Sequence, residues 1–305
     1  MRAAAILGLG CSAKDLKPFQ TDSTIEWSLG LPETGDQAEV IFLFGGDGTI
    51  HRHLGQLVQL RLPVLVVPAG SGNDFARALG LKRVRDSLAA WSRFCDGERG
   101  DKNVRQIDLG TITALGSESI RNSEPGTRHF CCVAGIGLDA EVARRANGLP
   151  RWLRGHGGYA LSAAPSILTF APFRMRILTP PQPDVPSEAW VSRSDQPTML
   201  AAFANTPQYG GGMKIAPQAT MDDGLLDVCI VGAVDPFKLF CMFPTVYAGK
   251  HLGIKEVEYF HAPRVRVETE HPLDVYADGE YVCRTPVEIG IQPAALRVVT
   301  PPNAA

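Results

Sequence analysis

Hydrophobic and polar positions in the first hundred residues alternate between short apolar runs and longer amphipathic segments. The apolar runs predict buried strands at residues 3–10, 23–29, 39–44 and 63–68. The amphipathic segments predict helices at residues 50–60, 74–81 and 84–97. Buried strands separated by helices are typical of a mostly parallel sheet covered on both faces. This part of the chain therefore predicts a doubly wound α/β domain.

The pattern changes after residue 103, where strand-like segments and turn signals become frequent. Strands are predicted at residues 105–115, 128–138, 173–180, 198–206, 225–232, 264–270, 273–292 and 295–301. Helices are predicted within residues 141–170 and 235–249, and exposed loops at residues 116–127 and 180–197. The expected organisation is an α/β domain at residues 1–103 and a mostly antiparallel, β-rich domain at residues 104–305.

Composition narrows the classes of partner. The 305 residues carry a formal net charge of -2, which argues against nucleic acid as the main partner. The seven cysteines form no C-x-x-C pair, which favours a reducing, cytoplasmic setting. No apolar run approaches the roughly 18 residues of a membrane span, so membrane contact is expected to be peripheral.

The stretch VIFLFGGDGTIHRH, residues 40–53, ends a buried strand in a glycine turn. Gly45, Gly46 and Gly48 free the backbone to approach a ligand, and Thr49 is placed to cap the helix that follows. Bare amides at a helix N-terminus favour phosphate, whereas Asp47 repels phosphate unless a metal or a proton transfer is involved. The turn therefore indicates phosphoryl chemistry, and the alternative is a plain turn with a solvated aspartate.

A second turn, in PAGSGNDFARALG at residues 68–80, repeats this design. Flexible residues Gly70, Ser71 and Gly72 follow a buried strand, and Asn73 and Asp74 open a short helix. Two such turns after consecutive parallel strands share one edge of the sheet, where open α/β folds bind ligands. The alternative for Asn73 and Asp74 is helix capping alone.

Other nucleotide motifs fit less well. The chain has no G-x-x-x-x-G-K-[ST] sequence, which excludes a P-loop. Residues 8–13, GLGCSA, match G-x-G-x-x-A, with Glu26 at the distance of a ribose-binding acid. The segment between them contains Pro18 and is too short for a full crossover helix, which argues against a dinucleotide site.

In the second domain, YADGEY brings Asp278 and Glu280 together around Gly279. If the segment is one strand, carboxylates at positions i and i+2 share a face, and their repulsion could raise one pKa or recruit a metal. The alternative is a hairpin turn with Asp-Gly at its tip.

Six motifs occur in an order that resembles the diacylglycerol kinase catalytic domain family, which includes bacterial lipid kinases and the sphingosine and ceramide kinases. They are FGGDGT, PAGSGNDFARALG, VAGIGLDAEVA, GGYALSA, ANTPQYGGGMKIAPQATMDDGLLDV and YADGEYVCRTPVEI. The resemblance implies an ATP-dependent lipid kinase that acts on diacylglycerol or a related lipid at a membrane surface. It also implies a phosphofructokinase- or NAD kinase-like nucleotide domain, a β-sandwich second domain and an active site in the cleft between them.

The resemblance also implies roles for particular residues. ATP would be bound by the first turn, at Gly45, Gly46, Asp47, Gly48, Thr49, Ile50 and His51, and by the second, at Gly70, Ser71, Gly72, Asn73 and Asp74. Asp278 matches the general base of the bacterial lipid kinases, with Glu280 beside it, and Asp47 is the alternative base. A structural Mg²⁺ would be bound by Thr220, Asp223 and Leu225, the last of which can act through its main-chain carbonyl.

The chain departs from the family pattern at two places. GLGCSAKD stands where many relatives have an Asn-Pro-x-Ser-Gly turn, and Arg52 stands where many have an acid. His51 and His53 could be read as a metal pair, but they fall on different faces of a helix. The arginines and Trp152 of residues 144–154 fit either a lipid headgroup surface or a solvated helix end.

Two other functions stay open at this point. One is an NAD kinase-like enzyme with a soluble acceptor, and the other is a catalytically weak lipid- or nucleotide-binding protein. The sequence also leaves a homodimer open.

Overall fold

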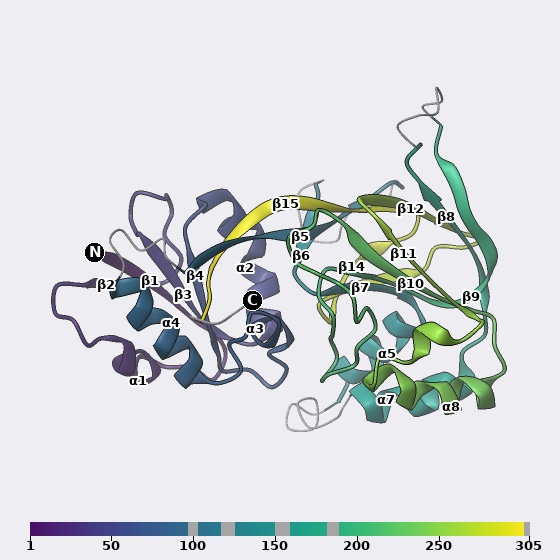
Figure 1. Cartoon of the computed structure of the whole chain (residues 1–305), viewed down its shortest axis with the longest axis horizontal. Coiled ribbons are helices and arrows are strands. Elements are labelled where there is room, and N and C mark those ends of the chain that lie inside the picture. Colours follow the sequence, from purple (N-terminus) through teal and green to yellow (C-terminus); the bar gives the residue numbers. More distant parts are fainter. Residues whose placement is uncertain (97–102, 117–125, 150–158, 182–188, 302–305) are drawn as a thin grey trace. The chain divides into compact units, whose positions relative to one another are not determined.

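The computed structural model describes residues 1–96, 103–116, 126–149, 159–181 and 189–301 (Figure 1). These residues form two compact units, Met1–Asp108 with Pro293–Ala305, and Leu109–Gln292. The chain passes between the units within β5 (Val104–Ala114) and again within β15 (Val287–Val299). This division differs from the expected single boundary after residue 103, because the C-terminal end of β15 returns to the first unit.

The first unit contains a parallel sheet. Its strands β1 (Arg2–Leu7), β2 (Glu26–Leu29), β3 (Val40–Gly45) and β4 (Val64–Pro68) pair in the order β2-β1-β3-β4, all in parallel, and β15 pairs with β4. Its helices are α1 (Ala13–Leu16), α2 (Asp47–Leu60), α3 (Asp74–Ala78) and α4 (Val84–Asp96), and a 3₁₀ turn spans Lys17–Phe19. The predicted α/β architecture is confirmed.

Strand β3 shows why this sheet forms. All six of its residues are buried, as expected for a central parallel strand covered on both faces. Phe42 packs edge-on against Trp91 of α4 and against Phe19, with ring centroids 4.8 and 5.4 Å apart. This aromatic core fixes the C-terminal end of β3, where the first glycine turn begins.

The second unit is built from antiparallel pairs. Its strands are β6 (Arg128–Phe130), β7 (Val133–Gly137), β8 (Phe173–Thr179), β9 (Val191–Ala204), β10 (Leu226–Gly232), β11 (Val257–Ala262), β12 (Arg264–Thr269), β13 (Asp274–Ala277) and β14 (Glu280–Arg284). Helices α5 (Leu138–Asn147), α7 (Tyr159–Thr169) and α8 (Pro236–Tyr247) gather beside these strands (Figure 1), with a 3₁₀ turn at His251–Gly253. The antiparallel sandwich expected for this domain is confirmed.

The long strand β9 organises the second unit. Its first half pairs with β8, and residues 198–204 pair with β10, while residues 200–204 also pair with β7. The inner faces of these strands form one core that includes Phe203, Val228 and Ile177. Three local predictions were wrong here: residues 191–197 are strand instead of loop, β11 was not expected, and a bend at Cys131 and Cys132 interrupts the strand predicted at 128–138.

Candidate active site

The two glycine turns of the first unit lie against each other. A Cβ atom added to Gly70 would lie 2.3 Å from the Cα of Gly46, and one added to Gly72 would lie 2.5 Å from Asp47 Oδ2. Because real Cβ atoms do not approach backbone so closely, glycine is required at position 70, and a side chain at position 72 would displace the Asp47 carboxylate. The shared sheet edge predicted for the two turns is therefore present in the structure.

The Asp47 carboxylate connects the turns. Asp47 Oδ2 accepts the amide of Asp74 at 3.0 Å, and Asp47 Oδ1 accepts the amide of Phe75 at 3.1 Å. These two amides begin α3, and its N-cap residue, Asn73, provides no side-chain hydrogen bond to the helix. Asp47 therefore caps a helix 27 residues further along the chain, and it is not the solvated turn residue of the alternative interpretation.

The second turn is held by its own residues. Asn73 adopts a left-handed backbone with φ of 58°, and its side chain accepts the Gly70 amide at 2.9 Å and donates to the Gly70 carbonyl at 2.7 Å. Asp74 is buried and forms an ion pair with Arg77. Asn73 and Asp74 thus shape the turn in addition to beginning the helix, while Ser71 is exposed.

The helix after the first turn begins earlier than expected. Its N-cap is Gly46, and Thr49 lies in the first helical turn with its amide donating to the Gly46 carbonyl at 2.9 Å. The prediction that Thr49 caps the helix was wrong. Instead, the Thr49 side chain occupies the space that glycine leaves at the ends of two strands, since a Cβ on Gly45 or Gly8 would lie 2.6 or 2.7 Å from Thr49 Oγ1.

In the second unit, Asp278 is at the tip of a hairpin between β13 and β14. Its φ of 51° and that of 83° at Gly279 are left-handed, as a tight Asp-Gly turn requires. Asp278 and Glu280 therefore do not belong to one strand, and the expectation that their carboxylates share a strand face was wrong. Glu280 is exposed at the start of β14.

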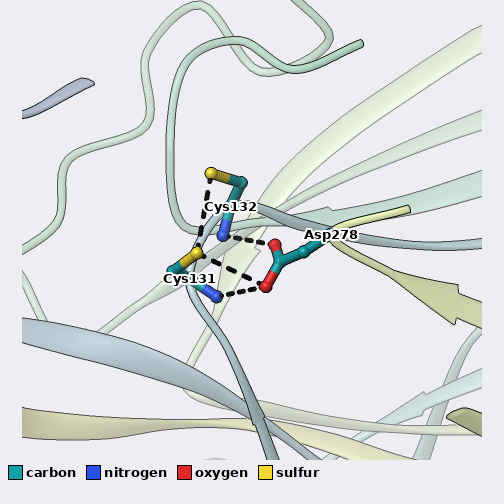
Figure 2. Close-up of side chains that lie close together, drawn as sticks. All are labelled: Cys131, Cys132 and Asp278. Atoms are coloured by element: carbon teal, nitrogen blue, oxygen red, sulfur yellow. Dashed lines mark hydrogen bonds between the residues drawn. The ribbon is translucent and has the colours of Figure 1, made fainter. Parts of the chain in front are cut away.

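The Asp278 carboxylate is nevertheless fixed in place. Asp278 Oδ2 accepts the Cys131 amide at 2.9 Å and Oδ1 accepts the Cys132 amide at 2.8 Å (Figure 2). The side-chain amide of Asn205 donates to the Cys131 carbonyl at 3.2 Å, and that of Asn147 donates to the Gly279 carbonyl at 2.7 Å. The bend is thus held by a buried side-chain contact, and the hairpin by an exposed one.

Sequence reasoning missed these supporting residues. Cys131 and Cys132 were only part of the strand predicted at residues 128–138, and Asn205 and Asn147 received no role. Asp278 is held by backbone amides, which do not depend on the type of side chain, so the residue types gave no signal for these contacts.

The segment predicted to bind Mg²⁺ forms an exposed turn. Asp223 Oδ1 accepts the Leu225 amide at 2.9 Å, and Thr220 and Asp223 are both exposed. Its carboxylate and main-chain carbonyl oxygens are the donors that a hard cation prefers, and solvent exposure would let Mg²⁺ keep its waters. The donor set therefore fits Mg²⁺.

Asp227, in the same motif, is fully buried in β10. It accepts a hydrogen bond from the Tyr259 hydroxyl, and His261 Nε2 lies 3.1 Å from its Oδ1. Burial raises the pKa of the Asp227 carboxyl.

A pocket with an empty volume of about 660 Å³, open to solvent, lies within the second unit. Side chains of α5, α7, α8 and the adjoining strands line it, including Val142, Ala163 and Met242. Its polar lining residues are Asp139, Tyr209 and His251, and the Tyr209 hydroxyl donates to the Asp139 carboxylate. The apolar lining with a few polar groups suits a hydrocarbon chain that carries a polar group.

His251 is buried at this pocket, with Nε2 3.0 Å from the Ile215 carbonyl oxygen. Burial lowers the pKa of its imidazole. The ring is therefore neutral near pH 7, and it remains one of the three polar groups that line the pocket.

The arginine-rich segment after α5 is only partly described. Arg144 and Arg145 both contact Glu141, with Nε–Oε distances of 2.8 and 2.6 Å. These contacts lower the pKa of Glu141. Residues 150–158, with Arg151, Trp152 and Arg154, lie outside the described residues.

Models of two protein families match the chain. The diacylglycerol kinase catalytic domain matches residues 26–112, and the YegS C-terminal NAD kinase beta sandwich-like domain matches residues 132–300. A diacylglycerol kinase of Mycobacterium tuberculosis (strain ATCC 25618 / H37Rv) is 33% identical over 263 residues, which cover 86% of this chain and 77% of that protein. The chain belongs to the diacylglycerol kinase catalytic domain family.

Other proteins match the chain at lower identity. A Bacillus subtilis (strain 168) diacylglycerol kinase is 26% identical over 269 residues, covering 88% of this chain and 79% of that protein. A diacylglycerol kinase structure from Bacillus anthracis str. Sterne matches with a TM-score of 0.65 at 16% identity, covering 100% of this chain and 98% of that one. An NAD kinase from Archaeoglobus fulgidus in complex with ATP matches with a TM-score of 0.51 at 14% identity, over 99% and 94% of the chains. These structures support the fold.

Among the described helices, none is long and apolar enough to cross a bilayer.

Proposed function

We propose that the protein is a lipid kinase that transfers the γ-phosphate of ATP to a hydroxyl group of diacylglycerol or of a related lipid such as a sphingoid base or ceramide. The observation that carries this proposal is the apolar pocket in the unit that also holds Asp278. A lipid acceptor can bury its acyl chain there, whereas a soluble acceptor such as NAD gains little from an apolar lining.

The first unit would bind ATP through its two glycine turns. Residues 45–51 and 70–74 follow neighbouring parallel strands, and the 14-residue helix α2 directs its positive N-terminal end toward the first turn. Asp47 keeps the two turns in register through the amides of Asp74 and Phe75.

Asp278 would act as the general base. Its oxygens each accept one backbone amide hydrogen, which orients the carboxylate toward a position where it could accept the proton of a substrate hydroxyl. As the hydroxyl proton moves to Asp278, the oxygen bonds to the γ-phosphorus and the bond to the ADP oxygen breaks. Glu280, exposed beside the hairpin tip, is the second acid near this step.

Magnesium would contribute in two places. Mg²⁺ bound with ATP neutralises charge on the phosphates. Thr220, Asp223 and Leu225 would bind a separate structural Mg²⁺ through oxygen atoms.

The lipid would be reached at a membrane surface. On α8, Phe237 and Phe240 are 74% and 47% exposed, and Leu168 of α7 is 62% exposed. Large apolar side chains on helices that line the pocket favour peripheral contact with lipid.

The test is transfer from labelled ATP in the presence of Mg²⁺, with a panel of lipids in mixed micelles and with NAD. We expect label in a lipid hydroxyl for the wild type and none for Asp278→Asn. Label in NAD alone, or lipid and ATP binding without transfer, would refute the proposal.

A pocket variant tests the acyl-chain site directly. Ala163→Phe fills the pocket, and excluding two to four methylenes at about 0.8 kcal/mol each should reduce kcat/KM for a long-chain lipid roughly 10- to 200-fold. The KM for ATP should not change. Leu168→Phe is the matched control because it adds the same ring to the exposed face of α7.

A further inference from the structure

A cluster of two thiols and a carboxylate lies at the bend between β6 and β7. The Cys131 and Cys132 sulfurs are 3.9 Å apart, and Cys131 Sγ lies 3.4 Å from Asp278 Oδ2 (Figure 2). Both cysteines are buried, with 0% and 3% of their surface exposed. All three candidate ligand atoms lie within 4.8 Å of one another.

The local backbone explains why these groups converge. Adjacent residues of a regular strand point to opposite faces, but residues 131 and 132 form a bend, so their sulfurs lie 3.9 Å apart and Cys131 Sγ faces Asp278 (Figure 2). The amides of the same two residues hold the carboxylate, and the Asp278 amide donates to the Val133 carbonyl at 3.0 Å. The cluster is therefore organised before any ligand binds.

Two of the three separations match a tetrahedral thiolate site. With Zn–S bonds of about 2.3 Å and Zn–O bonds of about 2.0 Å, tetrahedral angles place two sulfurs about 3.8 Å apart and a sulfur about 3.5 Å from an oxygen. The two sulfurs are 3.9 Å apart and Cys131 Sγ lies 3.4 Å from Asp278 Oδ2, while Cys132 Sγ lies within 4.8 Å of the carboxylate. A disulfide fits less well, because it requires sulfurs about 2.05 Å apart and Cα atoms more than about 4.4 Å apart, whereas adjacent residues hold them at about 3.8 Å.

We infer that Cys131, Cys132 and Asp278 bind a thiophilic divalent cation such as Zn²⁺ through two thiolates and one carboxylate oxygen. The fourth position would be taken by water. Binding replaces the two thiol protons, which pass to solvent, and leaves a site with one net negative charge and no change of oxidation state. This site is separate from the oxygen-donor turn at Thr220, Asp223 and Leu225, which suits a hard cation.

Occupation of this site inhibits phosphoryl transfer, and this consequence, unlike the binding itself, rests on the proposed function. A carboxylate bound to Zn²⁺ cannot accept the hydroxyl proton. The cysteines thereby make the candidate general base sensitive to thiophilic metal.

The binding test uses the full-length, reduced and chelator-stripped protein with Co²⁺ as a spectroscopic probe and Zn²⁺ as competitor. We expect thiolate-to-cobalt charge-transfer absorption that Zn²⁺ removes at one equivalent. Cys131→Ser and Cys132→Ser should each weaken the affinity for Co²⁺ about tenfold or more, since each removes a ligand. Cys241→Ser, which changes an exposed thiol of α8, should bind as the wild type does.

A second measurement uses the wild type alone. X-ray absorption of the zinc-loaded native protein should show two sulfur neighbours at about 2.3 Å and oxygen neighbours at about 2.0 Å around the metal. A zinc environment without sulfur, or cobalt spectra without thiolate bands, would overturn the metal site.

Inhibition is then measured at one equivalent of Zn²⁺ in excess Mg²⁺. We expect the wild type to lose transfer and regain it with chelator, and Cys132→Ser to resist. Zinc binding without inhibition would support the site and overturn the role of Asp278 as proton acceptor. Transfer to lipid without zinc binding would overturn the metal site and leave the proposed function supported.

Discussion

The capping role of Asp47 can be tested with a substitution that keeps the shape of the side chain. We expect asparagine, which has the same shape but carries an amide group, to fail as a cap for α3. Its two oxygens accept the first two amides of α3, at 3.0 and 3.1 Å. Asp47→Asn keeps one acceptor and turns an N–H donor toward the other amide. Asp47→Ala removes both acceptors.

The magnitude follows from these two bonds. Hydrogen bonds to charged groups contribute about 1.5–3 kcal/mol each, and solvent can replace part of this at a half-buried site, so we expect a loss of about 3 kcal/mol. At about 1.4 kcal/mol per factor of ten, the amides of residues 74 and 75 should exchange with solvent roughly 100-fold faster. Both variants should also bind ATP more weakly, because the second turn loses its position.

The assay is native-state hydrogen exchange of residues 70–81, with ATP affinity measured on the same samples. Asp86→Asn is the control, since its carboxylate caps the nearby Arg83 amide at 2.8 Å in an exposed setting. Unchanged exchange at residues 74 and 75 in Asp47→Asn, together with lost transfer activity, would refute the capping role and favour Asp47 as a group acting on substrate.

Further predictions concern the second unit. Burial lowers the pKa of His251, so the unfolded chain binds the imidazole proton more tightly than the folded chain does. The free energy of unfolding should therefore fall as the pH drops below about 6.5, and His251→Gln should weaken this pH dependence in urea titrations between about pH 5 and 7.5. Phe237→Ser and Phe240→Ser should each weaken binding to lipid vesicles about tenfold or more in a sedimentation assay, while Leu29→Ser, at an exposed site of the first unit, should not. Mg²⁺ should raise the Tm of the wild type but not that of Asp223→Ala; equal shifts would contradict the assigned site.

The first unit could be predicted from local patterns because its signals are short in range. An apolar run such as residues 40–45 is buried on both faces, so its burial pattern and its strand assignment coincide. The contact between the glycine turns also followed from topology, since neighbouring parallel strands end at one edge. The Asp47 hydrogen bonds could not be foreseen, because the first amides of α3 can be satisfied either by the N-cap residue itself or by a carboxylate far away in the sequence.

The second unit resisted prediction because its pairings are distant in sequence. Residues 191–197 are rich in polar side chains, and their strand exists because β8 supplies hydrogen-bond partners, such as Ser194 opposite Ile177. Likewise, Asp278 is held by the amides of Cys132 and Cys131, which lie 146 and 147 positions earlier in the chain. No local signal connects such partners.

The same long-range anchoring affects how loss of activity in Asp278→Asn is interpreted. Asparagine tolerates the left-handed turn, yet its amide nitrogen would face the N–H of Cys131 or Cys132 and so loosen the hairpin. Asn147→Ala separates the loss of hairpin position from the loss of the proton acceptor, because it removes the hydrogen bond to the Gly279 carbonyl and leaves the Asp278 carboxylate intact. We expect Asn147→Ala to lower kcat about tenfold at most while keeping the wild-type dependence of rate on pH, and Asp278→Asn to abolish transfer. If Asn147→Ala were as inactive as Asp278→Asn, hairpin position alone would account for the loss, and proton transfer to Asp278 would lose its support.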